Sequence, residues 1–214
     1  MAVATEINSS SDQLATELVS IVGADAVLTE TEALRPFECD GLTAYRELPL
    51  MVVLPSSISQ VQDVMKACSR RKVPVVTRGA GTGLSGGALP LPNGVLLSLT
   101  RMNNILEIDA AARTARVQPG VTNLSISDAV RHLGFYYAPD PSSQIACSIG
   151  GNVAENSGGV HCLKYGLTVH NILQLKVVTV DGQLMTVGSE GLDSPGFDLL
   201  ALMTGSEGML GVVV

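Results

Sequence analysis

Apolar and polar positions follow two different periods along the chain, and the change of period separates predicted helices from predicted strands. Residues 9–22 carry apolar side chains at helical spacing after a run of serines, whereas residues 24–48 show no regular period. From residue 50 the pattern becomes one of short apolar runs broken by glycine and proline. We therefore expect residues 1–47 to form a helical and irregular N-terminal segment and residues 48–214 to form the main domain.

A β-α-β unit opens the main domain. Residues 50–54 form a continuous apolar run closed by Pro55, which is typical of a buried strand. Ser57 or Ser59 can then cap a helix, and residues 74–77 form a second short apolar run. The apolar residues of this helix share one face: Ile58, Val61, Val64, Met65 and Cys68. A helical connection of this length predicts that the two strands are parallel.

The rest of the domain alternates between predicted hairpins and helices. In chain order, the pattern predicts a strand at 95–99, a hairpin of 105–108 and 114–117, a helix at 123–133, a hairpin of 173–180 and 184–187, a helix at 197–203 and a strand at 209–214. Asp181-Gly182 is a strong turn signal for the second hairpin. Residues 139–166 are glycine-rich and polar, and no periodic pattern predicts an element there. The final strand would leave an open sheet edge, so we expect the chain to be a fragment or a protein completed by another segment.

Charge and composition exclude several classes of function. The formal charge of −7 disfavours nucleic-acid binding, and the one basic cluster, Arg70-Arg71-Lys72, ends a predicted helix, where it offsets the dipole. No stretch approaches the roughly 20 apolar residues that span a bilayer, and the polar N-terminus lacks the pattern of a secretion signal. The four cysteines form no CxxC pair, so we expect no disulfide, iron–sulfur or other metal site. We expect a cytoplasmic protein, with partners as the route to any peripheral attachment at the inner face of the plasma membrane.

A glycine loop follows the second predicted strand. Five glycines fall between residues 79 and 87, and their N–H groups can converge into a nest for phosphate oxygens. Residues 81–86 match the GxGxxG fingerprint, but Pro90 and Pro92 block the helix that a Rossmann site requires. No Gly-Lys-Ser/Thr follows, which excludes a Walker loop. The loop therefore predicts a dinucleotide site that is not of the Rossmann type.

Two further glycine-rich segments, residues 148–159 and 205–211, extend this prediction. Small residues leave room for a bulky ligand, and their Asn and Ser side chains offer neutral hydrogen-bonding groups. Three such segments in one chain indicate an elongated ligand that passes several parts of the backbone. FAD has that shape.

At these residues the sequence resembles flavoproteins of the vanillyl-alcohol oxidase type, whose FAD domain is named for p-cresol methylhydroxylase. The resemblance covers residues 20–214, and its nearest branch is that of glycolate oxidases and D-lactate dehydrogenases. It rests on four ordered segments: 78–87, 139–143, 148–159 with Lys164-Tyr165-Gly166, and 205–211. The resemblance implies an α+β fold of two α/β subdomains with the flavin between them, and a cap domain that this chain lacks.

The resemblance also implies which residues contact FAD. The first loop would wrap the pyrophosphate and continue toward the ribityl chain, the second would line the ribityl and flavin, and the third would lie along the second subdomain's wall. The implied cofactor-binding residues are Arg78, Gly79, Ala80, Gly81, Thr82, Gly83, Leu84, Ser85, Gly86, Pro139, Asp140, Ser143, Gly150, Gly151, Asn152, Ala154, Glu207, Gly208 and Val212. Thr82 stands where some relatives attach FAD through a histidine, so we expect a non-covalent flavin.

In such enzymes a small 2-hydroxy acid, glycolate or D-lactate, becomes the 2-oxo acid as its α-hydrogen leaves as hydride to flavin N5. Partner subunits, of iron–sulfur and second flavin type, would accept the electrons. The base and the carboxylate clamp are expected in the missing part, so no catalytic residue is assigned and the chain alone is expected to turn over weakly or not at all. Two alternatives stay open: another reductase on the same domain, such as that of enolpyruvyl-UDP-N-acetylglucosamine, and an FAD-binding module without turnover.

Four side chains are candidates for the catalytic base by their chemistry, but we expect each of them to have a structural role instead. His132 is expected on a helix surface, and His170 is expected to cap or pack at a strand. His161 lies in the flavin-facing segment and is expected to support it. Glu155 is expected to point outward as a polar surface residue.

Overall fold

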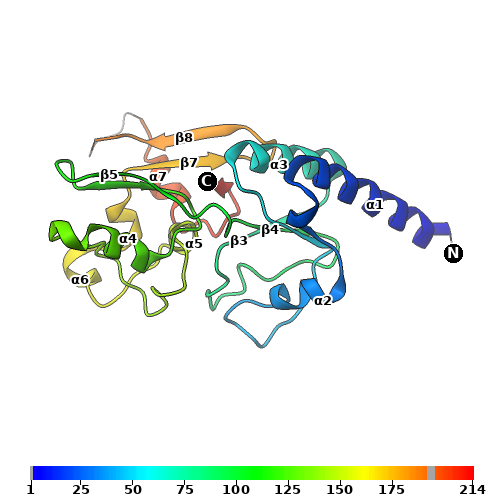
Figure 1. Cartoon of the computed structure of the whole chain (residues 1–214), viewed down its shortest axis with the longest axis horizontal. Coiled ribbons are helices and arrows are strands. Elements are labelled where there is room, and N and C mark those ends of the chain that lie inside the picture. Colours follow the sequence, from blue (N-terminus) through cyan, green and yellow to red (C-terminus); the bar gives the residue numbers. More distant parts are fainter. Residues whose placement is uncertain (1, 192–195) are drawn as a thin grey trace.

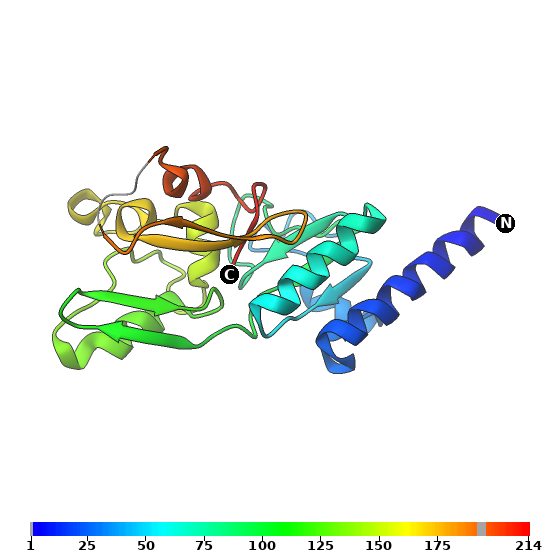
Figure 2. The ribbon, with the colours of Figure 1, turned by 90° about the horizontal axis from the view of Figure 1, so that it is seen from above.

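The computed structural model describes residues 2–191 and 196–214, with side chains from residue 11 onward. Figures 1 and 2 show an elongated molecule in which the first helix projects from one end. The helices and strands are α1 (Ala2–Val22), β1 (Val27–Leu28), α2 (Thr31–Leu34), β2 (Met51–Val53), α3 (Ile58–Arg71), β3 (Val75–Arg78), β4 (Val95–Ser98), β5 (Ile105–Asp109), β6 (Thr114–Val117), α4 (Asn123–Val130), α5 (Ile149–Glu155), α6 (Cys162–Tyr165), β7 (Gln174–Val178), β8 (Leu184–Gly188), α7 (Leu199–Met203) and β9 (Val212–Val213). Short 3-10 turns occupy Ala24–Ala26, Arg35–Phe37, Arg131–Leu133 and Thr168–Asn171.

The first subdomain is a four-stranded sheet in the order β1-β2-β4-β3. Strands β2 and β3 both run parallel to β4, which lies between them, and this confirms the predicted parallel β-α-β unit. Side chains alternate between the two faces of the sheet. One face of β2 and β4 packs against α1 and α3, whereas Val52 and Leu96 on the other face pack against Leu34 of α2.

Helix α3 begins and ends as its sequence predicts. The Ser57 hydroxyl accepts a hydrogen bond from the N–H of Gln60 at 3.3 Å, so Ser57 rather than Ser59 is the cap. At the other end, Arg70 and Arg71 both pair with Glu17 of α1. The basic cluster therefore ties two helices together in addition to offsetting the dipole of α3.

The second subdomain combines a three-stranded antiparallel sheet, β8-β7-β9, with the β5-β6 hairpin. Both predicted hairpins are confirmed by their registers. Val153 of α5 and Met203 of α7 pack onto Leu175 and Val187 of the sheet. The turn between β7 and β8 reaches the first subdomain, where the side-chain amide of Gln62 donates to the carbonyl of Gly182 at 3.0 Å (Figure 2).

The structure adds elements that the sequence pattern does not predict. Residues 24–48 contain β1, which pairs with β2, and the short helix α2. Residues 139–166 contain α5, although Gly150 and Gly151 are poor helix formers. Its N-cap Ser148, the apolar contacts of Val153 and the close packing of Gly150 on Pro119 compensate for the two glycines. Helix 123–133 ends as an α-helix at Val130 and finishes in a 3-10 turn.

Candidate cofactor-binding site

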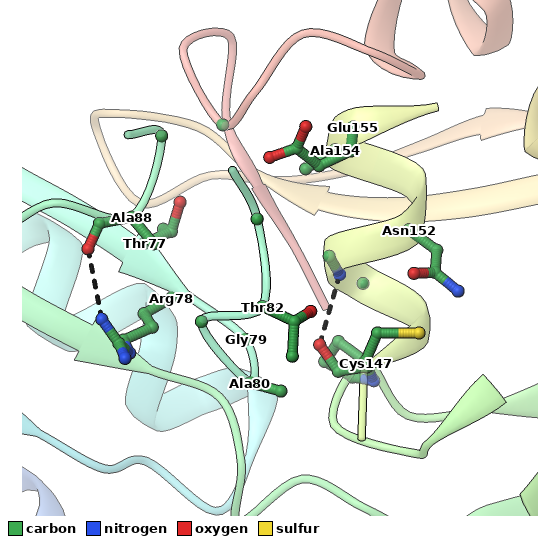
Figure 3. A pocket seen from close by; sticks show the side chains of 18 of the residues that line it. Thr77, Arg78, Gly79, Ala80, Thr82, Ala88, Cys147, Asn152, Ala154 and Glu155 are labelled. Carbon is green, nitrogen blue, oxygen red and sulfur yellow. Dashed lines mark hydrogen bonds between the residues drawn. The ribbon is translucent and has the colours of Figure 1, made fainter. Parts of the chain in front are cut away.

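A pocket lies between the two subdomains, where β3 and β4 end. Gly79 follows β3 directly and Leu99 follows β4, and both residues line the pocket. The carboxyl ends of parallel strands are the usual place for ligands in open α/β sheets. About 1010 Å³ of space lies between the walls, the open mouth included. Figure 3 shows the glycine loop on one side of this pocket and α5 on the other.

The three glycine-rich segments meet at this pocket. A β-carbon placed on Gly79 would lie 2.1 Å from the Ser148 hydroxyl oxygen, so the first segment touches the second without room for a side chain. A β-carbon on Gly208 would lie 2.5 Å from the Thr77 hydroxyl oxygen, so the third segment touches β3. Glycine is required at Gly208 for a second reason, because its φ is +78°. The predicted convergence of the three segments is therefore a direct consequence of their glycines.

Hydrogen bonds join the second and third segments. The N–H of Gly205 donates to the carbonyl of Val153 at 2.8 Å, and the N–H of Glu207 donates to the carbonyl of Ala154 at 2.9 Å. These bonds add donors to the carbonyl groups in the last turn of α5, where the Val153 carbonyl also accepts from the N–H of the C-cap residue Asn156 at 3.2 Å. The C-terminal end of α5 therefore holds the 205–207 backbone against the pocket.

The structure distinguishes two candidate anion sites at the pocket, the start of α5 and the glycine loop. The first N–H groups of α5 already have acceptors: Ile149 donates to the carbonyl of Val121, Gly150 to that of Pro119 and Gly151 to the Ser148 hydroxyl. By contrast, among the residues that the structure describes, the main-chain N–H groups of residues 79–83 have no hydrogen-bond acceptor. Unpaired amides in a glycine-rich turn fit a phosphate anion. The loop therefore suits the pyrophosphate of a dinucleotide, and α5 does not.

Arg78 supports this loop from behind. Arg78 is 8% exposed, and its guanidinium donates to the carbonyl of Cys39 at 2.8 Å. It also donates to the carbonyl of Ala88 at 3.4 Å (Figure 3). It also lies 5.8 Å from the centre of the Phe37 ring. Burial lowers the pKa of Arg78, and nearby Asp40 opposes that shift. Arg78 therefore lines the pocket and also fixes the 79–88 loop onto the 37–40 segment.

Most of the residues assigned to FAD from the resemblance line the pocket. They are Arg78, Gly79, Ala80, Gly81, Thr82, Gly83, Ser143, Gly150, Gly151, Asn152, Ala154, Glu207 and Gly208. The other six lie outside its lining: Leu84, Ser85, Gly86, Pro139, Asp140 and Val212. Val212 is 2% exposed within the core, and its neighbour Val213 lines the pocket instead, because successive residues of a strand face opposite sides.

Several lining residues carry no sequence signal for a ligand. Thr77, Leu99 and Pro119 belong to a strand end and to turns that the pattern assigns to structure alone. Cys147 is 4% exposed and also lines the pocket. Their role follows only from the tertiary arrangement.

Glu155 is an exposed polar residue, as expected, but its place at the pocket was not predicted. It is solvent-accessible, but it lines the pocket from the end of α5 (Figure 3). Partial burial, and then the carboxylates of Glu207 and Asp40, raise the pKa of Glu155. No sequence pattern predicts α5, whose geometry places this side chain at the pocket.

The three histidines occupy the structural positions predicted for them. His132 is exposed, and His170 Nδ1 accepts a hydrogen bond from the N–H of Leu167 at 3.1 Å. His161 Nδ1 lies 2.6 Å from Asp140 Oδ2, and the main-chain N–H of His161 donates to Asp140 Oδ1 at 3.3 Å. Asp140 therefore anchors the 159–165 segment through His161. No group of three or more metal-ligating side chains occurs in the described part of the chain, and no helix within it is long and apolar enough to cross a membrane.

This combination defines a class of domain: two α/β subdomains that hold an extended phosphate-containing cofactor between them without a Rossmann helix. The family described as "FAD binding domain" matches residues 49–188. The chain belongs to this family, and FAD is its cofactor.

Curated relatives give a consistent picture. The chain is 67% identical over 186 residues to glycolate oxidase subunit GlcD of Escherichia coli K12, a match that covers 87% of this chain and 37% of the relative. It is 39% identical over 198 residues to GlcD of Bacillus subtilis, covering 92% of this chain and 42% of the relative. It is 39% identical over 189 residues to D-lactate dehydrogenase of Archaeoglobus fulgidus, a match that covers 87% of this chain and 42% of the relative. The chain thus spans about two fifths of the length of these relatives.

Solved structures confirm the predicted fold. Alkyldihydroxyacetonephosphate synthase superposes with a TM-score of 0.81 at 24% identity, over 94% of this chain and 37% of that protein. The substrate-bound structure of p-cresol methylhydroxylase superposes with a TM-score of 0.77 at 23% identity, over 95% of this chain and 42% of that protein. The α+β fold of p-cresol methylhydroxylase type is therefore correct, and the chain is not a Rossmann domain.

Proposed function

We propose that the chain is the FAD-binding portion of a 2-hydroxy-acid dehydrogenase that converts glycolate or D-lactate to the 2-oxo acid. One observation carries the proposal: the 67% identity to a glycolate oxidase subunit over 87% of the chain. The similarity to a D-lactate dehydrogenase supports the same substrate class. A module that binds FAD without turnover remains the second candidate, because the chain spans 37% of that first relative.

Different segments of the chain would contact different parts of FAD. The N–H groups of residues 79–83 would bind the pyrophosphate, and hydrogen bonds to a charged acceptor contribute about 1.5–3 kcal/mol each. The 143–154 wall would flank the ribityl chain and flavin, and the 207–208 backbone would close the far side. Bound FAD supplies a two-electron acceptor, and the protein's part is to position it and exclude water.

We place neither the catalytic base nor the carboxylate clamp in this chain. His161 is engaged by Asp140, and Arg78 donates to main-chain carbonyls. The chain loaded with FAD is therefore expected to be reduced by dithionite but to bleach slowly or not at all with glycolate or D-lactate under anaerobic conditions. Rapid bleaching by either acid would contradict this prediction.

A chimaera tests the substrate class. Residues of this chain replace the matched 186-residue segment of the E. coli subunit, and anaerobic flavin reduction by glycolate is followed by absorbance. We expect a rate within tenfold of the parent subunit. A matched chimaera carrying Gly81→Glu should bind little FAD and serve as the negative control. A chimaera that binds FAD but is not reduced by glycolate or D-lactate would favour the module without turnover.

We also propose that the flavin is non-covalent. Thr82 lines the pocket, and its hydroxyl lacks the nucleophilic ring nitrogen by which a histidine attaches a flavin. Acid precipitation of the yellow protein should therefore leave the flavin in the supernatant. Flavin that remains with the washed pellet would contradict the proposal.

The electron acceptor is proposed to be a partner protein. The similar E. coli protein is named as a subunit, which supports assembly with other chains. The four cysteines of this chain are free thiols and form no cluster site. Iron–sulfur and second flavin-type subunits would then carry the electrons onward.

A further inference from the structure

Two carboxylates face the loop that is proposed to bind the pyrophosphate. A β-carbon placed on Gly83 would lie 2.8 Å from Glu155 Oε1, so this carboxylate lies directly against the loop. A β-carbon placed on Gly87 would lie 3.7 Å from a carboxylate oxygen of each of Glu155 and Glu207. Figure 3 shows the Glu155 side chain directed from the end of α5 toward the glycine loop. Both the carboxylates and a pyrophosphate on this loop would carry negative charge. Like charges so close together repel, so two ionised carboxylates would oppose the binding of the pyrophosphate.

The surroundings of Glu155 disfavour its ionised form. Glu155 is the last residue of α5, where the helix dipole places partial negative charge. Glu207 faces it from the 205–211 segment, and Asp40 acts on it from the segment before β2. Arg78 is the nearby cation, but its guanidinium is engaged by main-chain carbonyls. Within the described residues, neither Glu155 nor Glu207 forms an ion pair.

We propose that Glu155 is a further ligand-binding residue: it takes up one proton when the dinucleotide binds and, as a neutral carboxylic acid, donates a hydrogen bond to a pyrophosphate oxygen. The proton comes from solvent and stays on Glu155, and no electrons move. A protonated carboxyl group can donate, whereas a carboxylate only accepts. The inference rests on the proposed function, because it takes the pyrophosphate to lie on the 79–83 loop.

The proposal fixes the sign of a pH dependence. The pKa of Glu155 is already raised in the free protein, and a nearby pyrophosphate raises it further. At pH values between the pKa of Glu155 in the free protein and its pKa in the complex, the complex holds one more proton than the free protein. The affinity for FAD therefore falls as pH rises through that window, by at most about tenfold per pH unit for one proton. A neutral residue at this position removes the dependence.

The test is a titration of the chain with FAD from pH 5.5 to 8.5 at constant ionic strength, followed by flavin fluorescence and by calorimetry in two buffers. FAD is the appropriate probe because its pyrophosphate has no terminal phosphate, whose second pKa of about 6 would confuse the result. For the wild type we expect Kd to rise with pH and calorimetry to show uptake of up to one proton. For Glu155→Gln we expect a Kd that does not change with pH and is lower than that of the wild type at pH 8.

Two further variants make the result specific. Glu107→Gln is the matched control, because Glu107 is exposed on β5 and pairs with Arg116, and it should keep the wild-type slope. Glu207→Gln should move the pH window downward, because it removes a neighbouring negative charge. Glu155→Gln with a wild-type slope, or with tenfold weaker binding at pH 8, would overturn the role of Glu155. Wild-type binding independent of pH would overturn it too, whereas no FAD binding at any pH would overturn the proposed function itself.

Discussion

At the scale of the residue, the site depends on where side chains are missing. Gly79 lets the first loop approach the N-cap of α5, and Gly208 lets the third segment approach β3. Both residues line the pocket without a side chain. A dinucleotide can be held in this way without lysine, because amide dipoles replace formal positive charge.

Gly79→Ala should weaken FAD binding by at least tenfold. Its β-carbon would lie 2.1 Å from the Ser148 hydroxyl oxygen, so the loop must move away from α5. The measurement is the Kd for FAD, with circular dichroism to show that the variant is folded. Gly191→Ala is the control, because its β-carbon meets nothing closer than 3.9 Å and Gly191 lies outside the pocket lining. Wild-type affinity in Gly79→Ala would show that the close contact is not needed.

The candidate site could be predicted only in part at this scale. Glycines identify a backbone that approaches a ligand, so the sequence predicts that Gly79 to Gly83 and Gly150 to Gly151 lie at the pocket, and they line it. The direction in which a side chain points cannot be predicted in this way. The places of Glu155 and Val213 at the pocket depend on an element and a register that the pattern does not specify.

At the scale of the element, α5 connects the parts of the pocket. Its first turn is anchored to the 119–121 backbone, and its last carbonyls accept from Gly205 and Glu207. Seven residues are too few for an isolated helix to be stable in water. Tertiary contacts therefore create this element, and it in turn positions the second and third glycine segments.

Helix α3 is the opposite case, because its own sequence specifies it. Ser57→Ala removes the N-cap hydrogen bond and should lower the free energy of unfolding by about 1 kcal/mol. Urea denaturation measures the loss. Ser69→Ala, on the exposed face of the same helix, should change stability by less than about 0.5 kcal/mol. Equal effects of the two substitutions would contradict the assigned cap.

At the scale of the whole molecule, the two subdomains are joined on the side away from α1. The Val178 and Val212 side chains of the second sheet are buried in the core of the first subdomain. Gln62 of α3 donates to the turn at Gly182. The pocket between the subdomains is thus held by a core that both share.

The boundary at residue 48 remains a prediction, and α1 offers a test of it. Leu18 is fully buried against the first core, so Leu18→Ala should cost about 2–5 kcal/mol of unfolding free energy. Val19→Ala, at a position 36% exposed on the same helix, is the control and should cost far less. If residues 1–47 are separate from the folding unit, Leu18→Ala will leave the urea transition of the remainder unchanged.

The sequence by itself predicted every strand except β1, both hairpins and α3, because these depend on periodicity and turn residues read locally, and the resemblance of its glycine-rich segments indicated the family. Its glycine segments also indicated FAD. Tertiary structure alone decided that β4 lies between β2 and β3, that residues 149–155 form a helix and that Glu155 faces the pocket. These features depend on contacts between segments distant in the chain, which a local pattern does not contain.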